Sequence, residues 1–126
     1  MKATIASLIF LLLSLAVSSQ TYKYIGIEEG LSNQKIYRIQ KDARGYMWFL
    51  THVGIDRYNG KEIKHYKLKE GDRELDPLLN INWTYLDKTG TLLVTGKQGR
   101  IFRYDSGHDR FVQIYSMYNY WNKDYH

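Results

Sequence analysis

The sequence predicts an all-β protein built from short antiparallel strands, and three observations lead to this class. After the first twenty residues, apolar residues do not recur at the spacing of an amphipathic helix. Short runs rich in Ile, Val, Tyr, Phe and Trp are instead bounded by Gly, Asp and Asn, which is the pattern of strands. These runs fall into two units that repeat after about 45 residues.

The first element, residues 1–20, has the layout of a secretory signal peptide. Lys2 supplies the positive start, an apolar run extends from Ile5 to Val17, and Val17-Ser18-Ser19 offers small residues for cleavage. We therefore expect an exported chain that begins near Gln20 or Thr21. The alternative is an uncleaved anchor, but a membrane span needs ~20 apolar residues and this run is shorter. No membrane span is expected after cleavage.

The predicted strands follow in order along the rest of the chain. They are Tyr22–Ile27, Ile36–Gln40, Met47–Thr51, Ile55–Tyr58, Ile63–Lys67, Trp83–Leu86, Leu92–Thr95, Ile101–Tyr104 and Phe111–Tyr115.

Three turns connect these strands with recognisable chemistry. Asn59-Gly60 predicts a two-residue hairpin in which both residues have positive φ. Asp42–Gly45 and Asp87–Gly90 share the form Asp-x-x-Gly, in which the carboxylate caps the turn and glycine takes the left-handed conformation.

The two Asp-x-x-Gly turns open the internal repeat. Equivalent pairs are Asp42/Asp87, Gly45/Gly90, Gly54/Gly99, Ile55/Ile101, Arg57/Arg103, Tyr58/Tyr104 and Tyr66/Tyr115. Four strands per unit at this period are typical of a β-propeller blade, and the alternative is a chance match in a glycine-rich β protein. Because propellers typically have at least four blades, we expect an incomplete propeller: an N-terminal fragment, a truncated gene or a gene-prediction error.

The predicted organisation has six parts. They are a signal peptide (1–20), a leading strand that would complete the last blade of a full propeller (21–30), blade 1 (31–69), a linker loop (70–80), blade 2 (81–116) and a tail or the start of a further blade (117–126).

A family resemblance lies on the first unit. The segments that carry it are Gly30-Leu31-Ser32-Asn33, Ile36-Tyr37, Asp42–Gly45, Tyr46-Met47-Trp48-Phe49 and Gly54-Ile55-Asp56-Arg57-Tyr58-Asn59-Gly60. They resemble the first blade of the two-component regulator propeller repeats, and Asp87–Tyr104 matches more weakly. The second unit departs from the pattern because Leu93 stands in place of Trp and Thr95-Gly96 reverses the usual order; in the first unit Leu50 stands where Gly is usual.

The resemblance implies a function as well as a fold. The family forms periplasmic sensor regions of membrane-bound regulators, especially hybrid two-component systems of Bacteroides-type bacteria. The chain is therefore expected to be the N-terminal part of such a sensor, not an enzyme. Its expected partners are an extracytoplasmic ligand, with an oligosaccharide as one candidate, and the rest of the propeller. Two alternatives stay open: a fragment of a secreted propeller hydrolase or lyase, and a secreted binding module that self-assembles.

The sequence offers no catalytic, metal or cofactor motif. The chain has no cysteine, and His52, His65, His108 and His126 form no short-spaced pair, so no metal site is expected. Gly96-Lys97-Gln98-Gly99 is interpreted as a turn rather than a phosphate loop. The carboxylate pairs Glu28-Glu29 and Asp72/Glu74 are interpreted as solvated loop residues, so no catalytic residue is predicted.

The ligand-binding residues are left unknown by the sequence. Trp48 and Trp83 are both candidates for stacking on sugars, but Trp48 is expected to lie in the core. The formal net charge of +5 could suggest nucleic-acid binding. Export and the mixed charges of residues 57–76 argue against nucleic acid as a partner.

Overall fold

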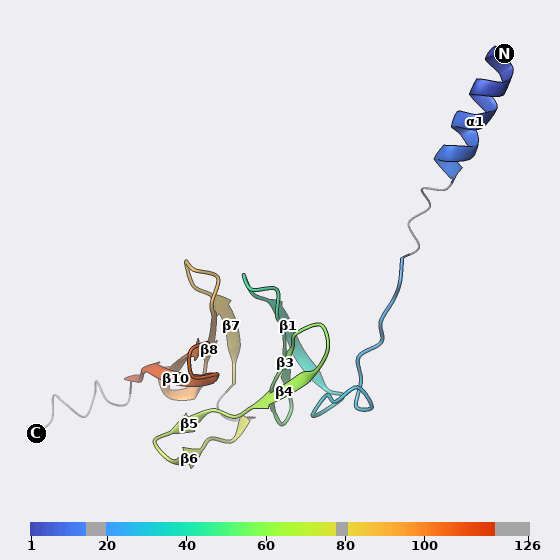
Figure 1. Cartoon of the computed structure of the whole chain (residues 1–126). Helices are drawn as coiled ribbons and strands as arrows, with labels where there is room; N and C mark the ends of the chain where they lie inside the picture. Colours follow the sequence, from blue (N-terminus) through green and yellow to red (C-terminus); the bar gives the residue numbers. More distant parts are fainter. Residues whose placement is uncertain (15–19, 78–80, 118–126) are drawn as a thin grey trace, which may run out of the picture.

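The computed structural model describes residues 1–14, 20–77 and 81–117. Two four-stranded antiparallel sheets lie next to each other, and helix α1 (Lys2–Ser14) stands apart from them (Figure 1). The predicted all-β class is confirmed. In the described part of the chain, no helix is long and apolar enough to cross a membrane.

Each sheet has its strands in sequence order. The first holds β1 (Ile36–Lys41), β2 (Met47–Thr51), β3 (Gly54–Tyr58) and β4 (Ile63–Tyr66), and the second holds β7 (Trp83–Leu86), β8 (Leu92–Thr95), β9 (Ile101–Asp105) and β10 (Arg110–Tyr115). A short 3-10 helix, η1 (Lys97–Gly99), joins β8 to β9. The eight strands predicted from residue 36 onward are confirmed to within one residue at each end.

The predicted leading strand Tyr22–Ile27 is wrong. Residues 21–25 form no strand, Tyr22 and Tyr24 are exposed, and a turn follows in which the Leu31 amide donates to the Gly26 carbonyl at 3.0 Å. A strand needs a hydrogen-bonding neighbour, and among the described residues none pairs with this segment.

The predicted linker loop 70–80 is wrong in its first half, because a third sheet, of two short strands, forms there. Strands β5 (Lys69–Glu70) and β6 (Arg73–Glu74) make a hairpin. Leu68 and Leu75 flank the hairpin and are both buried. The hairpin is therefore stabilised by burial of these two side chains as well as by the hydrogen bonds between β5 and β6. Residues 78–80, most of the predicted tail and the predicted cleavage residues lie outside the described residues.

The Asn59-Gly60 hairpin is also wrong in its length. Tyr58 pairs with Ile63, so the loop has four residues, and Gly60 but not Asn59 has positive φ (98°). The Asn59 side-chain oxygen accepts hydrogen bonds from the Lys61 and Glu62 amides, both at 2.9 Å. This local side-chain turn replaces the tighter backbone turn.

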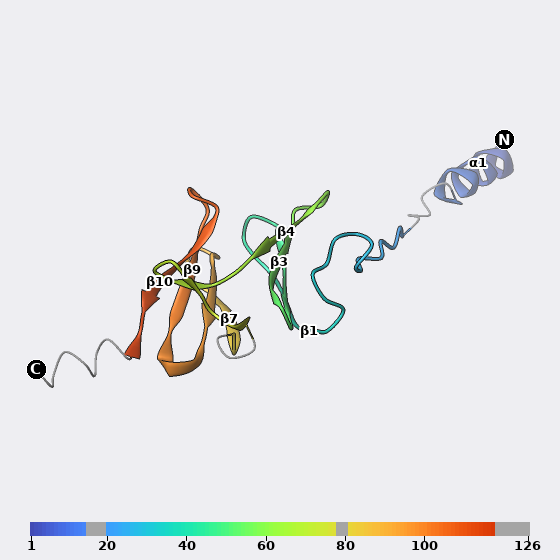
Figure 2. The same cartoon turned by 90° about the horizontal axis from the view of Figure 1, so that it is seen from below.

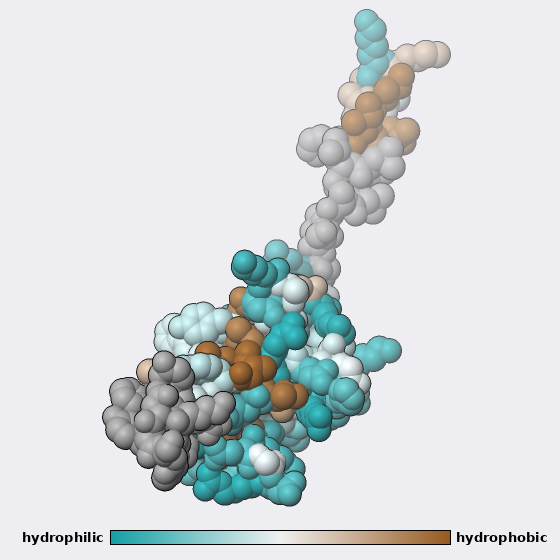
Figure 3. All heavy atoms as spheres, turned by 90° about the vertical axis from the view of Figure 1, so that its left-hand side faces the viewer, coloured by the Kyte–Doolittle hydropathy of each residue, from teal (hydrophilic) through white to brown (hydrophobic). Residues whose placement is uncertain are grey.

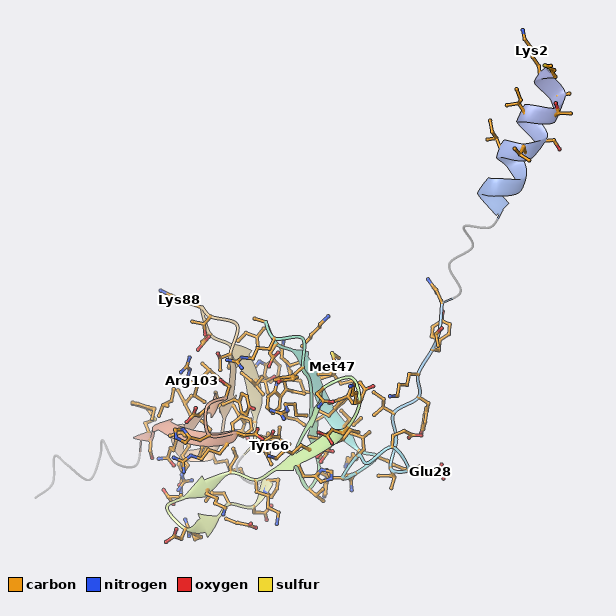
Figure 4. All side chains as sticks on the ribbon, viewed as in Figure 1. Lys2, Glu28, Met47, Tyr66, Lys88 and Arg103 are labelled. Carbon is orange, nitrogen blue, oxygen red and sulfur yellow. The ribbon has the colours of Figure 1, made fainter. Side chains whose placement is uncertain are left out.

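The core lies between the two sheets. Four aromatic rings meet there, Trp48 and Tyr66 from the first sheet and Tyr104 and Phe111 from the second, and their centroids are 4.7 to 5.9 Å apart in all six pairs. Tyr66 is seen in Figure 4 at the junction of the sheets. These contacts make the sheets one packed body rather than two isolated blades.

The Asp-x-x-Gly turns have the predicted geometry in both units. Gly45 and Gly90 have φ values of 87° and 74°. Oδ1 of Asp42 accepts hydrogen bonds from the Arg44 and Tyr46 amides at 2.9 and 3.0 Å. Asp87 Oδ1 accepts the amides of Thr89 and Thr91 at 2.8 and 3.0 Å. The structural equivalence of the two turns is confirmed.

The second carboxylate oxygen binds a different donor in each unit. Asp42 Oδ2 accepts the indole N–H of Trp48 at 2.8 Å, within a buried environment. Leu93 replaces that tryptophan in the second unit, and Asp87 Oδ2 accepts Arg103 Nε at 2.9 Å instead. The departure at Leu93 is thus compensated from the neighbouring strand.

Gly90→Val is expected to destabilise the protein more than Gly45→Val. Both place a Cβ in the left-handed region, at ~1–2 kcal/mol. A Cβ at Gly90 would also lie 2.3 Å from the Ala43 Cβ, whereas Gly45 has open space. That contact adds an overpacking cost of about 1–3 kcal/mol. Urea unfolding followed by tryptophan fluorescence measures the difference.

Lys97→Val is the matched control for these two variants. Lys97 does not have positive φ, so its replacement is expected to change the free energy of unfolding by no more than about 0.5 kcal/mol. Equal stability of all three variants would contradict the alignment of the two units.

Candidate functional site

A groove of about 450 Å³ lies where β1 and β7, the first strands of the two sheets, come together. Figure 2 shows these two strands on the same side of the molecule. The lining residues come from β1, β2, β7 and the segment before β7: Tyr37, Arg38, Leu50, Thr51, Pro77, Ile81, Asn82 and Trp83. This mixture of aromatic, apolar and hydrogen-bonding side chains is typical of a small-ligand site.

Trp83 and Arg38 form the centre of the groove. They occupy equivalent places in the two units, because Arg38 pairs with Leu50 across β1 and β2 as Trp83 pairs with Thr95 across β7 and β8. The Arg38 guanidinium carbon lies 3.2 Å from the Trp83 ring centroid, a cation–π contact. Trp83 is 45% exposed, whereas Trp48 is fully buried, which confirms the prediction that Trp48 belongs to the core.

Two polar contacts border the groove and hold its wall in place. The Tyr37 hydroxyl and His52 Nδ1 are hydrogen-bonded at 2.5 Å, and their rings stack. Thr51 is buried, and its hydroxyl donates to the Gly54 carbonyl at 3.2 Å. The first contact connects β1 to the turn after β2, and the second connects β2 to β3, at the border of the groove.

A buried carboxylate, Asp56, ties the segment before β1 to the first sheet. Asp56 Oδ2 accepts both the amide and the hydroxyl of Ser32 at 2.8 Å, and Oδ1 is 2.7 Å from His65 Nδ1. The order is not that of a serine hydrolase, because the carboxylate lies between serine and histidine and the imidazole does not reach the hydroxyl. The cluster therefore holds the segment before β1 against the first sheet. In the sequence, Ser32 and Asp56 lie in separate segments of the family resemblance, and His65 is only one of four isolated histidines.

Asp109 joins the two sheets at the edge of the aromatic core, where it contacts Tyr66 and Tyr104. It lies in the turn between β9 and β10 with φ 50°. Its Oδ1 accepts hydrogen bonds from the hydroxyls of Tyr66 (2.5 Å) and Tyr104 (2.7 Å) and from Arg57 (3.0 Å). Its Oδ2 forms an ion pair with Lys64. We refer to these five residues as the Asp109 clasp.

The clasp shifts the protonation of its members. Burial acts to raise the pKa of Asp109, but the hydrogen bonds from Lys64, Tyr66 and Tyr104 and the Arg57 charge outweigh it and hold that pKa well below its usual range. Burial and then the hydrogen bond to Asp109 raise the pKa of Tyr104 to about 12 and that of Tyr66 further still. At neutral pH the acid is charged and both phenols are protonated.

The clasp borders a wider hollow of about 820 Å³ between β4, the β5–β6 hairpin and β10. Most of its charged side chains are already paired: Lys64 with Asp109, Lys67 with Glu74, and Glu70 with Arg73 and Arg100. Because these charges neutralise one another, we assign the hollow a structural role.

The other residues singled out by the sequence lie apart from the groove. Glu29 accepts a hydrogen bond from the Gly26 amide at 2.7 Å, and Glu74 pairs with Lys67. His65 contacts Asp56 and His108 contacts Asp105, while His126 is outside the described residues. No group of three metal-ligating side chains occurs among residues 1–14, 20–77 and 81–117.

The fold and its repeated turns define the class of protein: a β-propeller of which the described residues form two blades. Residues 30–52 match the two component regulator propeller family model, which confirms the resemblance seen in the sequence. The match runs from Gly30 through β1 and β2 and includes Ser32, the Asp42 turn and Trp48. A comparison with curated proteins found no match.

Proposed function

We propose that the chain belongs to the extracytoplasmic sensor region of a two-component regulator. The observation that carries this proposal is the family match at residues 30–52, which falls on the first sheet and on one wall of the groove. The signal-peptide layout of residues 1–20 supports export to the periplasm. In this proposal the chain binds a ligand and performs no chemistry on it.

The export step has a direct test. The full chain is expressed in a Gram-negative bacterium, and the periplasmic fraction is analysed by intact-mass spectrometry. The expected mass is that of a chain beginning at Gln20 or Thr21. A chain that keeps residues 1–20 and sediments with the membranes would contradict cleavage and favour an anchor.

The groove between β1 and β7 is proposed to bind an oligosaccharide. The half-exposed indole of Trp83 offers an apolar ring for the carbon face of a sugar, and the exposed Asn82 supplies polar atoms beside it. Arg38 adds a cation, and among the described residues no carboxylate forms an ion pair with it. No Asp or Glu lines the groove in the described part of the chain, so the hydrolase alternative receives no support at this place.

Trp83→Ala and Arg38→Ala are expected to abolish oligosaccharide binding. Calorimetric titration with cellotetraose and trigalacturonic acid, one neutral and one acidic, measures the affinity and its charge preference. The matched control is Tyr85→Ala, an exposed aromatic of the same strand that lies outside the groove. Loss of binding in the control as well, or unchanged binding in both groove variants, would contradict this site without affecting the export test.

A further inference from the structure

Another hollow, of about 500 Å³, lies beside the groove, and Pro77 lines both of them. It is bounded by the turn between β2 and β3, which contains His52 and Val53, and by the segment after β6, which contributes Leu75 and Asp76. We refer to it as the Val53 hollow. Each hollow alone is in the lower half of the range of about 300–1,000 Å³ that is usual for ligand sites, and the two together come close to its upper end.

The border between the groove and the Val53 hollow is a stacked pair of rings. Tyr37 lines the groove and His52 lines the Val53 hollow, and their ring centroids are 6.0 Å apart. The Tyr37 side chain is exposed, so the border is not closed off by other residues. Rings of this kind combine an apolar body with a polar tip, and a sugar chain that lies in the groove can continue over them.

The Val53 hollow combines an exposed apolar side chain with a hydrogen-bonded backbone on both sides. On one side Val53 is 43% exposed, and its amide donates to the Thr51 hydroxyl oxygen at 3.3 Å. On the other side Leu75 is buried, and its amide donates to the Leu68 carbonyl at 2.9 Å. The hollow therefore has ordered walls and apolar surface that a ligand can cover.

The charges of the two hollows differ. The groove contains the Arg38 cation, with which no carboxylate of the described residues forms an ion pair. In the Val53 hollow, Lys67 and Glu74 lie 2.8 Å apart and neutralise each other, and Asp76 leaves no net positive charge there. The Val53 hollow is therefore expected to respond to the length of a sugar chain, and the groove to its charge.

Neither the groove nor the Val53 hollow depends on the exposed face of the second sheet. Figure 3 shows hydrophobic side chains gathered in the middle of this side of the molecule, and in a propeller such a face packs on a neighbouring blade. Leu93, Ile101 and Val112, which share that face by strand register, line neither of the two cavities. Both cavities are made by the two blades that the described residues form.

We propose that the groove and the Val53 hollow form one cleft with two subsites, which holds an oligosaccharide longer than a trisaccharide. The sugar chain runs from Trp83 past Pro77 to Leu75. This inference rests on the proposed oligosaccharide binding and adds a selection for chain length to it. A ligand that reaches the second subsite makes further contacts without a second loss of translational and rotational freedom, so its affinity is higher.

Calorimetric titration with three-unit and six-unit sugars of the same kind tests this selection. The probes are cellotriose with cellohexaose, and trigalacturonic with hexagalacturonic acid, and the protein is the chain recovered in the export test. The hexamer of the class that binds is expected to bind at least about tenfold more tightly than its trimer. That gain exceeds the roughly fourfold statistical advantage of a hexamer at a site for three units.

Val53→Asp is expected to lower the affinity for the hexamer to nearly that for the trimer and to leave the trimer unaffected. Unchanged binding of the trimer also shows that this variant is folded. Trp83→Ala is expected to lose both lengths. The matched control is Ile39→Asp, which places the same charge at an exposed β-branched residue outside both cavities and is expected to bind like the wild type.

The outcomes separate the second subsite from the proposed function. Equal affinity for both lengths, or a Val53→Asp variant that keeps the full affinity for the hexamer, would overturn the second subsite and leave the groove as the binding site. An equal loss in Ile39→Asp would show a general effect of charge and would also overturn it. If neither length of either sugar binds, the proposed oligosaccharide binding is wrong, and this inference is wrong with it.

Discussion

Trp48→Ala is expected to unfold most of the protein at room temperature. The side chain is fully buried and contacts Tyr66, Tyr104 and Phe111, so truncation removes contacts within both sheets. Removing a large aromatic from a core costs about 3–5 kcal/mol. The Asp42 carboxylate loses its indole donor as well, at about 1–3 kcal/mol for a buried group. Together these losses approach the total stability of about 5–15 kcal/mol of a typical small domain.

Urea unfolding followed by far-UV circular dichroism measures this loss against two controls. Trp48→Phe keeps most of the ring volume and removes the indole N–H, so a smaller loss is expected. Trp83→Ala removes a half-exposed tryptophan outside the aromatic core and is expected to cost far less. If Trp48→Ala were as stable as Trp83→Ala, the packing of the two sheets described above would be wrong.

Asp109→Ala is expected to weaken the contact between the two sheets and to lower the free energy of unfolding by about 2–3 kcal/mol. Breaking a buried ion pair by removing one partner costs about 3–5 kcal/mol, and partial exposure of Asp109 places the expectation at or below the lower end. The Arg57 side chain, 12% exposed, is left without its carboxylate, and Tyr66 and Tyr104 lose their common acceptor.

Asp109→Asn and Asp105→Asn separate the contribution of the Asp109 charge from that of the turn between β9 and β10. Asparagine at 109 keeps an acceptor and tolerates positive φ, so the remaining loss reports the charge alone. Asp105 lies in the same turn and pairs with the exposed His108, so its replacement is expected to cost no more than about 1 kcal/mol. Equal losses at 105 and 109 in urea unfolding would show that the turn, and not the clasp, is being measured.

The clasp also predicts the pH dependence of stability. The pKa of Asp109 is lower in the folded protein, so its contribution is present above the unfolded pKa of about 4 and is lost as the pH falls through the folded value. The pKa of Tyr104 is raised to about 12, so its contribution is present below the unfolded value of about 10 and is lost between these two. Urea unfolding from pH 3 to 11 should show both declines. Asp109→Asn should reduce the acid decline without removing it, because the pKa of Asp87 is also lowered, first by its hydrogen bond from Thr89.

Local chemistry explains why most of the fold could be predicted from the sequence. Strand patterns and the Asp-x-x-Gly turns depend on residues within a few positions of one another, and both turns form as expected. Tyr22–Ile27 has the composition of a strand, but composition does not supply a neighbouring strand. The β5–β6 hairpin was missed because each strand has only two residues, too few for an alternating pattern.

The candidate site could not be predicted from the sequence, for a different reason. Trp83 and Arg38 are 45 positions apart in the sequence, and only the packing of two sheets brings the guanidinium over the ring. The Asp109 clasp likewise joins residues from β3, β4, β9 and the last turn. Neither the Arg38–Trp83 pair nor the Asp109 clasp corresponds to a sequence motif with a fixed spacing. The repeat alignment does, however, place Arg38 and Trp83 at equivalent positions of the two units.

The turn aspartates carry a consequence for how such repeats diverge over time. One oxygen of Asp42 or Asp87 closes the turn with backbone amides, which every sequence possesses, and only the other oxygen depends on a side-chain donor. That donor can come from β2, as Trp48 does, or from β9, as Arg103 does. A lineage can therefore exchange its most recognisable aromatic residue for a basic residue one strand away while the blade keeps its shape. The turn geometry of such a repeat can therefore persist after the tryptophan of its sequence pattern has been lost.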